Sequence, residues 1–364
     1  MNGKHAVTSI QMMRFTFVCQ TGIGIIALPT LLAKEVGHDG WISVVVTGLI
    51  AIFLAALIVV LLRRYSDKCI FDITKLLFGK IAGIFINTIF FLYLLFAASL
   101  GLMVFLIYLR ITLFPLTPPI VMAPLIIMPS IYMVWEGMKT VARFKYVTMA
   151  SYIIAILYII LIIKDMRFSF LLPVGEAGFL PLLSSLKTSF FAFIGLELIA
   201  VFYPEISDKE KALKYHVLAN LFSMLFIAFI VVASTAVFGE KLLTVLNIPL
   251  FNLSRIFNAP IIERVDIYLV SAWFIAMGCS IRAYLMAAYY SMGKIFKVKK
   301  SRTVYAIFVC VFIGISLTTG DINKAFMLLD ILNYVGMGAI LLLIICLILS
   351  MFKKKGVVEY EQGV

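Results

Sequence analysis

The stretch Cys19-Gln20-Thr21-Gly22-Ile23-Gly24-Ile25-Ile26 lies in the middle of the first long apolar segment of the chain, Ile10–Leu32. Glycine costs about 1 kcal/mol relative to alanine inside a helix, and here two glycines stand beside two polar side chains, with Pro29 soon after. Irregular backbone at membrane depth is tolerated only where it lines a cavity or is buried in protein. The pattern therefore indicates a helix that unwinds and restarts, with a glycine pair used for close helix packing as the alternative.

The composition around this stretch excludes a soluble globular domain. Of the 364 residues, 63% are hydrophobic and 13% are charged, whereas soluble domains have about 45–50% apolar and about 25% charged residues. The formal net charge of +13 does not indicate nucleic-acid binding, because the basic residues lie between apolar segments rather than on one soluble face. The sequence therefore predicts an all-α polytopic protein whose surroundings are the lipid bilayer.

Ten segments are long enough for a hydrocarbon core about 30 Å thick, which requires about 20 helical residues. We expect them to form one membrane domain over residues 1–364, with a first five-helix repeat at 8–165 and a second, inverted repeat at 180–352. The segments are Ile10–Leu32, Ile42–Leu62, Ile81–Leu109, Pro119–Trp135, Tyr146–Ile163, Leu182–Tyr203, Leu213–Phe238, Ile267–Met292, Val304–Leu317 and Phe326–Phe352.

The basic residues predict the orientation of these segments. Most of the 31 Lys and Arg residues lie before the first segment, in alternate linkers and in the C-terminal tail. Cytoplasmic loops of membrane proteins are the basic ones. We therefore expect the N- and C-termini to be cytoplasmic, in agreement with an even number of spans.

The sixth segment has an interruption of its own, Phe190-Phe191-Ala192-Phe193-Ile194-Gly195-Leu196-Glu197. If the ten segments form two halves of five, the first and sixth segments hold equivalent positions. Because five is an odd number of membrane crossings, the second half begins on the opposite side of the membrane and is inverted. Paired broken helices in inverted halves point to a transporter-type binding site.

The two interruptions have complementary polarity. The first predicts free N–H groups around residues 23–26, which favour a carboxylate, and the sixth predicts helix-end carbonyls around residues 191–193, which accept from an ammonium group. A free amino acid or a similar small molecule is therefore the predicted ligand, although phenylalanine in a membrane segment more often faces lipid or the core. The predicted ligand-binding residues are Thr21, Gly22, Ile23, Gly24, Phe190, Phe193, Ile194 and Gly195.

Ionisable side chains within membrane segments are costly and are functional by default. Glu197 can pair with a cation, carry a coupling proton or fix the broken helix, and structural pairing is favoured. Arg282 is expected to pair with an acidic residue or to extend toward the cytoplasm. Lys145 can replace a sodium ion or, as is favoured, anchor the start of the fifth segment. No catalytic motif and no metal-ligand spacing is found, so the sequence predicts neither an enzyme nor a metal or other cofactor.

Several blocks together resemble a known family. Thr21-Gly22-Ile23-Gly24-Ile25-Ile26-Ala27-Leu28-Pro29 resembles the first-helix signature of amino acid–polyamine–organocation permeases. Asp39-Gly40-Trp41-Ile42-Ser43, Phe193-Ile194-Gly195-Leu196-Glu197 and Ile262-Glu263-Arg264-Val265-Asp266 narrow the resemblance. In this order and spacing they are similar to the endospore germination permeases, the GerAB-type B subunits of germinant receptors. The resemblance covers essentially the whole chain.

The resemblance implies a LeuT-like fold of five plus five inverted helices, with helices 1 and 6 broken, in the spore inner membrane. It implies a germinant-binding B subunit that works with A and C subunits. Gly22, Ile23 and Gly24 match the ligand segment of the first helix, and the segment Phe193-Ile194-Gly195 matches that of the sixth. No counterpart of a coupling-ion site is found.

Three functional hypotheses follow. The leading one is a sensor subunit in which an amino acid shifts the equilibrium of a transporter-like fold and partner subunits respond. The alternatives are a proton-coupled amino acid permease and a ligand-gated conduit for ions or small solutes.

Overall fold

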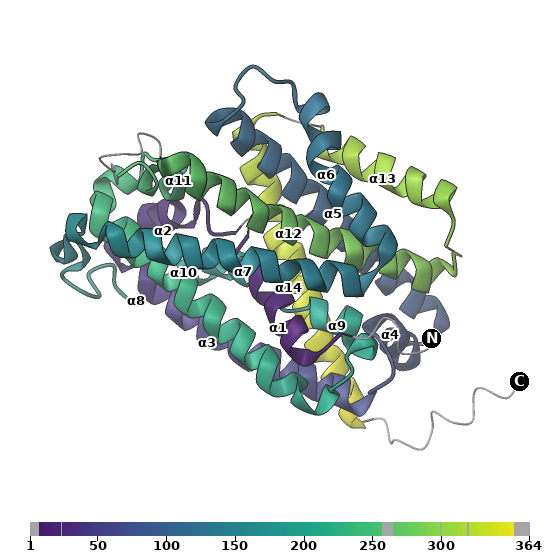
Figure 1. Ribbon diagram of the computed structural model, residues 1–364. Coiled ribbons are helices and arrows are strands. Elements are labelled where there is room, and N and C mark those ends of the chain that lie inside the picture. The colour runs from purple at the N-terminus through teal and green to yellow at the C-terminus, as the bar shows by residue number, and fades with distance from the viewer. Residues whose placement is uncertain (1–6, 23, 257–264, 299, 319, 353–364) are drawn as a thin grey trace, which may run out of the picture.

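The computed structural model describes residues 7–352, except residues 23, 257–264, 299 and 319. Figure 1 shows a bundle of helices joined by short connections. The α-helices are α1 Ser9–Gln20, α2 Leu28–Val36, α3 Gly40–Arg64, α4 Ile70–Phe78, α5 Lys80–Thr112, α6 Pro119–Glu136, α7 Met138–Leu161, α8 Phe179–Phe190, α9 Leu198–Phe202, α10 Ala212–Leu243, α11 Pro249–Leu253, α12 Val265–Phe296, α13 Arg302–Ser316 and α14 Ile322–Phe352. The 3-10 turns are η1 Gly37–Asp39, η2 Ile163–Asp165, η3 Phe168–Leu171, η4 Phe191–Phe193, η5 Tyr203–Glu205 and η6 Lys209–Lys211.

These helices correspond to the predicted membrane segments. Within the described part of the chain, 8 helical stretches are long and apolar enough to cross a membrane, one of which runs α2 into α3. The two remaining predicted segments are the interrupted first one, whose first half is α1, and the short α13. The protein is therefore a multi-pass membrane protein. The fifth helix begins at Met138, which places Lys145 inside α7 rather than at its start.

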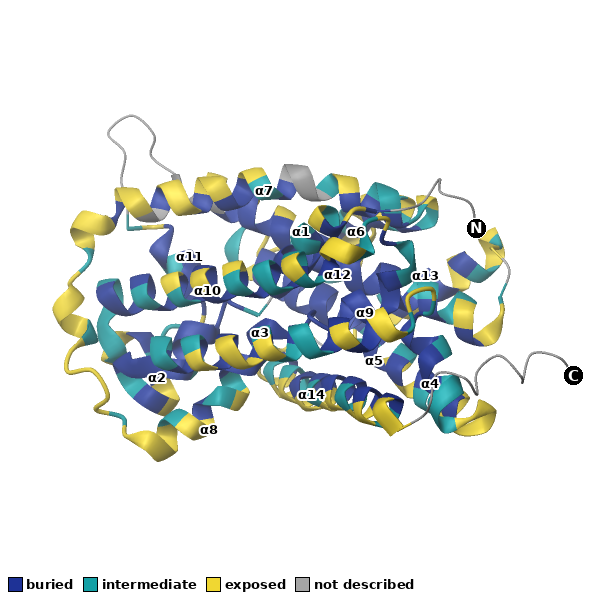
Figure 2. Ribbon diagram, turned by 90° about the horizontal axis from the view of Figure 1, so that it is seen from below, coloured by how far each residue is buried: buried dark blue, intermediate teal, exposed yellow. Residues whose placement is uncertain are grey.

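The helices divide into a central and a peripheral group. The most apolar windows of α12, α5 and the stretch Phe179–Glu205 are 83%, 78% and 78% buried, whereas those of α6 and α14 are 28% and 39% buried. Figure 2 shows the exposed faces of α3, α7, α10 and α14 turned outward, with buried residues gathered between them. Lipid covers such outward apolar faces without the cost that exposing them to water would carry.

Contacts at one end of the bundle join the segments that the charge pattern assigns to the cytoplasm. The Val7 N–H donates to Glu205 O at 2.8 Å, Ser9 Oγ donates to Asp208 O at 2.8 Å, and Arg64 Nη2 donates to Ser350 O at 2.8 Å. The observed fold therefore brings the start of α1, the end of α14 and two basic linkers to the same end. Which side of the membrane this end faces stays a prediction from the sequence.

Candidate functional site

The first membrane helix is interrupted, as its glycines and polar residues predict. α1 ends at Gln20 and α2 begins at Leu28. A helix that stops leaves its last carbonyls without intrahelical partners, and α12 supplies one, because Ser280 Oγ donates to Val18 O at 2.8 Å. The restart at Leu28 comes later than expected, so residues 24–27 belong to the unwound connection rather than to the N-terminus of the second half. Ile23 lies outside the described residues.

The glycines of this break allow two close approaches. An ideal Cβ at Gly22 would lie 1.8 Å from Ser280 Oγ on α12, and one at Gly24 would lie 3.0 Å from the Cα of Ala192 in η4. A side chain at either position would have to displace its neighbour. The first break is therefore packed directly against α12 on one side and against the sixth membrane helix on the other.

The sixth membrane helix is interrupted opposite this point. α8 passes through η4 into a non-helical segment, residues 194–197, and the helix resumes as α9 at Leu198. Gly195 has a φ of +118°, a backbone conformation that side-chain-bearing residues rarely adopt. Glycine is thus required at the turn, and the predicted interruption of both helices is confirmed.

Gln20 joins the two breaks. Its Nε2 donates to Phe193 O at 3.0 Å and to Asn220 Oδ1 on α10 at 2.8 Å, and its Oε1 accepts from Ser223 Oγ at 2.6 Å. The sequence pattern predicts carbonyls around Phe193 that are open to a ligand ammonium. In this structure the Phe193 carbonyl is taken by the protein's own amide, so a ligand that uses it must displace Gln20.

Glu197 stabilises the sixth break. Its side chain is 0% exposed, and its Oε2 accepts from the N–H of Gly195 at 2.8 Å. Its Oε1 accepts from the hydroxyls of Tyr93 on α5 at 2.8 Å and Tyr284 on α12 at 3.2 Å. Among the three roles left open by the sequence, these contacts favour fixing the broken helix, since each of these three partners is a neutral donor group rather than a cation.

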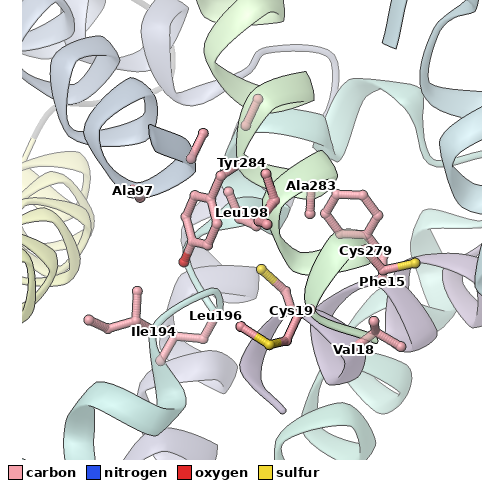
Figure 3. Close-up of a cluster of buried hydrophobic side chains, with 14 of the residues drawn as sticks. Phe15, Val18, Cys19, Ala97, Ile194, Leu196, Leu198, Cys279, Ala283 and Tyr284 are labelled. Atoms are coloured by element: carbon pink, nitrogen blue, oxygen red, sulfur yellow. The ribbon is translucent and has the colours of Figure 1, made fainter. Parts of the chain in front are cut away.

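A small cavity lies between the breaks. Its volume is about 30 Å³, which is room for about two water molecules. Figure 3 shows Ile194 and Leu196 from the sixth break near Cys19 of α1 and Tyr284 of α12. Even glycine is larger than this space, so an amino acid requires a more open arrangement of these helices.

Only part of the predicted site lines this cavity. Gly24 and Ile194 do so, whereas Gly22 lies against α12 and Gly195 shapes the turn. Thr21 is directed toward α7, where its Oγ1 lies 2.7 Å from Tyr152 OH. Phe190 and Phe193 are 8% and 0% exposed within the apolar core, the position that phenylalanine more often takes.

The cavity has further walls outside the eight predicted ligand-binding residues. They come from α1, α5, η4, α12 and α14, and the residues are Cys19, Gln20, Ala97, Gly101, Phe191, Ser280, Tyr284, Leu329 and Leu332. One signal was available, because Ala97-Ala98-Ser99-Leu100-Gly101 is a run of mostly small residues in the third segment, and small residues allow close approach of membrane helices.

The two remaining ionisable residues are not part of the cavity. Arg282 is 5% exposed; its Nε donates to Ser130 Oγ at 3.1 Å and its guanidinium lies 4.3 Å from the ring centroid of Phe144. Within the described residues no carboxylate lies within salt-bridge distance of Arg282, so a cation–π contact takes the place of the expected acidic partner. The side chain of Lys145 lies outside the described part of the structure.

A loop, residues 172–178, covers the end of the first helix at which α2 meets η1. Asp39, which is fully buried, accepts from the N–H of Gly175 at 2.8 Å and of Ala177 at 2.9 Å. His38 Nε2 lies 2.7 Å from Pro173 O, and His38 Nδ1 lies 3.0 Å from Glu240 Oε2 on α10. The η1 turn, which follows α2, thus holds the loop that precedes α8.

In an Asp39→Asn variant we expect this loop to open more often. An amide side chain offers one acceptor oxygen where the carboxylate offers two, so one partly buried N–H of the loop loses its charged acceptor, at a cost of about 1–3 kcal/mol. Hydrogen exchange of the peptide covering Gly175 and Ala177 should accelerate about 5- to 150-fold. Asp165→Asn, at an exposed position, is the matched control, and equal exchange in the two variants would contradict the role of Asp39.

Comparison with known structures places this architecture among the LeuT-fold transporters. Mhp1, a nucleobase-cation-symport-1 family transporter in a closed conformation with bromovinylhydantoin bound, aligns with a TM-score of 0.67 at 12% identity, covering 94% of this chain and 80% of that chain. MhsT in complex with L-phenylalanine aligns with a TM-score of 0.61 at 15% identity, covering 93% of this chain and 89% of that chain. At such identities the likeness shows the fold alone. The predicted LeuT-like fold is confirmed.

Sequence comparison gives the family. The model of the family described as "Spore germination protein" matches residues 6–325. Spore germination protein A2 of Bacillus subtilis is 27% identical over 343 residues, covering 92% of each chain. Spore germination protein GerQB of Bacillus cereus is 27% identical over 256 residues, covering 70% of each chain, and YndE of Bacillus subtilis is 22% identical over 341 residues, covering 92% of this chain and 93% of that protein. The chain therefore belongs to the family of spore germination proteins.

Proposed function

We propose that this chain is the ligand-sensing B subunit of a spore germinant receptor, and that an amino-acid-like molecule binds between the broken first and sixth helices. The observation that carries the proposal is the pair of facing breaks around a small central cavity, in a chain of the spore germination family. Family membership supports the germination role, and the LeuT-like fold supports a site at the breaks.

The size of the cavity favours sensing. A ligand shifts a conformational equilibrium only if it binds the two states with different affinity. The closed site has about 30 Å³ of space, so it excludes an amino acid, and only a more open state can bind one. The small closed cavity therefore supports a proposal in which the ligand binds the open state better than the closed one. Partner A and C subunits would respond to the opening.

The proposed surroundings follow from the family and the charge pattern. We place the protein in the spore inner membrane with both termini in the cytoplasm, because the basic linkers gather at the end of the bundle where α1 begins. The two five-helix repeats, 8–165 and 180–352, remain our proposed division of the chain.

A binding and flux experiment tests this function. Purified protein would be screened against the common amino acids by thermal shift, and each stabilising compound would then be tested for counterflow into liposomes that contain only this protein. The sensor hypothesis expects a higher unfolding temperature without sustained uptake. Sustained uptake would favour the permease of the same fold, and stabilisation by no amino acid would contradict the proposed ligand class.

A Leu332→Trp variant serves as the blocked form in the same assays. Leu332 lines the cavity and is 5% exposed, so a larger side chain occupies the space into which a ligand must expand. Leu341→Trp on the same helix, where Leu341 is 60% exposed, is the matched control. Loss of the thermal shift in the first variant alone places the ligand at this cavity.

A further inference from the structure

A groove of about 410 Å³ lies on the outer surface of the bundle between α1, α7 and α10. Its rim includes Ile153 of α7 and Phe222 of α10, which are 58% and 47% exposed. Its floor consists of the buried rings of Phe17, Tyr152 and Phe226. Almost the whole lining is apolar, so the groove suits a hydrocarbon chain.

The floor of the groove lies directly behind the first break. The ring centroids of Phe17 and Tyr152 are 4.9 Å apart, and that of Tyr152 is 5.3 Å from Phe226. Tyr152 OH is 2.7 Å from Thr21 Oγ1, the residue that follows α1. A molecule in the groove therefore packs against the side chains that hold the unwound segment.

The groove has a positive charge at one end. Arg14, half-buried on α1, lines it near the end of the bundle where the basic linkers gather. Lys214, which is exposed, lies eight residues before Phe222 on α10, about two turns nearer the start of that helix. An apolar slot with basic residues at its inner end is complementary to an acyl chain that carries an anionic headgroup.

We propose that this groove binds an anionic phospholipid of the surrounding bilayer, with an acyl chain against Phe17 and Tyr152 and the phosphate at Arg14. The groove spans Phe222 to Phe229 on α10, which is about 10 Å at 1.5 Å per residue. This is about a third of the hydrocarbon thickness, a length that fits part of one acyl chain better than a partner's transmembrane helix. The proposal is independent of the amino acid ligand.

Native mass spectrometry of the purified full chain tests the proposal. The protein would be titrated with phosphatidylglycerol and with phosphatidylcholine that has the same acyl chains. Wild-type protein should bind phosphatidylglycerol about fivefold more tightly, as expected for about 1 kcal/mol per basic residue at an anionic surface. The unfolding temperature should rise more with phosphatidylglycerol than with phosphatidylcholine.

Two variants and one control define the site. Arg14→Gln should abolish the preference between the lipids, and Ile153→Trp, which fills the groove, should abolish the tight phosphatidylglycerol adduct. Arg63→Gln, at an exposed position outside the groove, should retain both. Equal binding of the two lipids to wild-type protein would overturn the proposal. So would an Ile153→Trp variant that keeps the adduct but alters the oligomeric state in the same spectra, since the groove would then be an interface between copies.

Discussion

A Gly22→Val variant is expected to lose its response to the proposed amino acid ligand completely while still inserting into the membrane. The Cβ of any side chain at this position would lie 1.8 Å from Ser280 Oγ and 2.8 Å from Ser280 Cβ. Relieving these overlaps forces α12 away from the first break, and overpacking of this kind costs about 1–3 kcal/mol or more. The measurements are germination of spores that carry the variant and thermal unfolding of the purified protein.

A rescue experiment shows whether the loss arises from this contact. The milder Gly22→Ala should be partly restored by Ser280→Gly, which removes both clashing atoms, with a coupling energy of about 0.5–3 kcal/mol between the two sites. Gly278→Ala on α12, the helix that carries Ser280, is the control, because a Cβ at Gly278 meets nothing within 4 Å. Strict additivity of Gly22→Ala and Ser280→Gly would show that the two residues do not interact.

Glu197→Ala should destabilise the fold more than any of the other substitutions proposed above. It removes the acceptor for the hydroxyls of Tyr93 and Tyr284 and for the N–H of Gly195. Buried donors without acceptors each cost about 1–3 kcal/mol, partly offset because a buried carboxylate no longer needs desolvation. We expect a net loss of roughly 3–5 kcal/mol, because three donors without an acceptor together outweigh the desolvation that is no longer required, seen as a lower unfolding temperature.

Variants of the partners separate the role of the carboxylate from general packing. Tyr93→Phe removes one hydroxyl and leaves the ring, so its cost should be well below that of Glu197→Ala. Glu210→Gln, at an exposed position in η6, should be neutral. If Glu197→Ala unfolds at the wild-type temperature, then Glu197 does not hold the sixth break and a role in proton movement becomes the better explanation.

The breaks of the first and sixth helices could be predicted from the sequence because backbone strain has a local signature. A pair of glycines beside polar residues in an apolar segment marks the first break, and the +118° φ of Gly195 explains the glycine in the sixth. The family could also be predicted from the sequence, because the motifs that carry the resemblance are contiguous stretches of residues.

Other parts of the site depend on which helices become neighbours, and no local pattern contains that information. No sequence pattern around Gln20 predicts its hydrogen bond to the carbonyl of Phe193, which lies 173 residues away. The contribution of Ala97 and Leu332 to the cavity likewise follows only from how α5 and α14 pack on the breaks. Asp39 falls in a recognisable block, yet its acceptor role depends on a distant loop.

If the germinant binds between the breaks, as proposed, the nearly filled interior there also sets how much germinant is needed. If the open arrangement is present in only a small fraction of molecules, the apparent dissociation constant rises by the inverse of that fraction. A one-percent open population would weaken apparent affinity about a hundredfold. The equilibrium between the closed and open arrangements then governs both dormancy and sensitivity. Tighter packing around Ile194 lowers the open population, which reduces germination in the absence of ligand and raises the ligand concentration that germination requires.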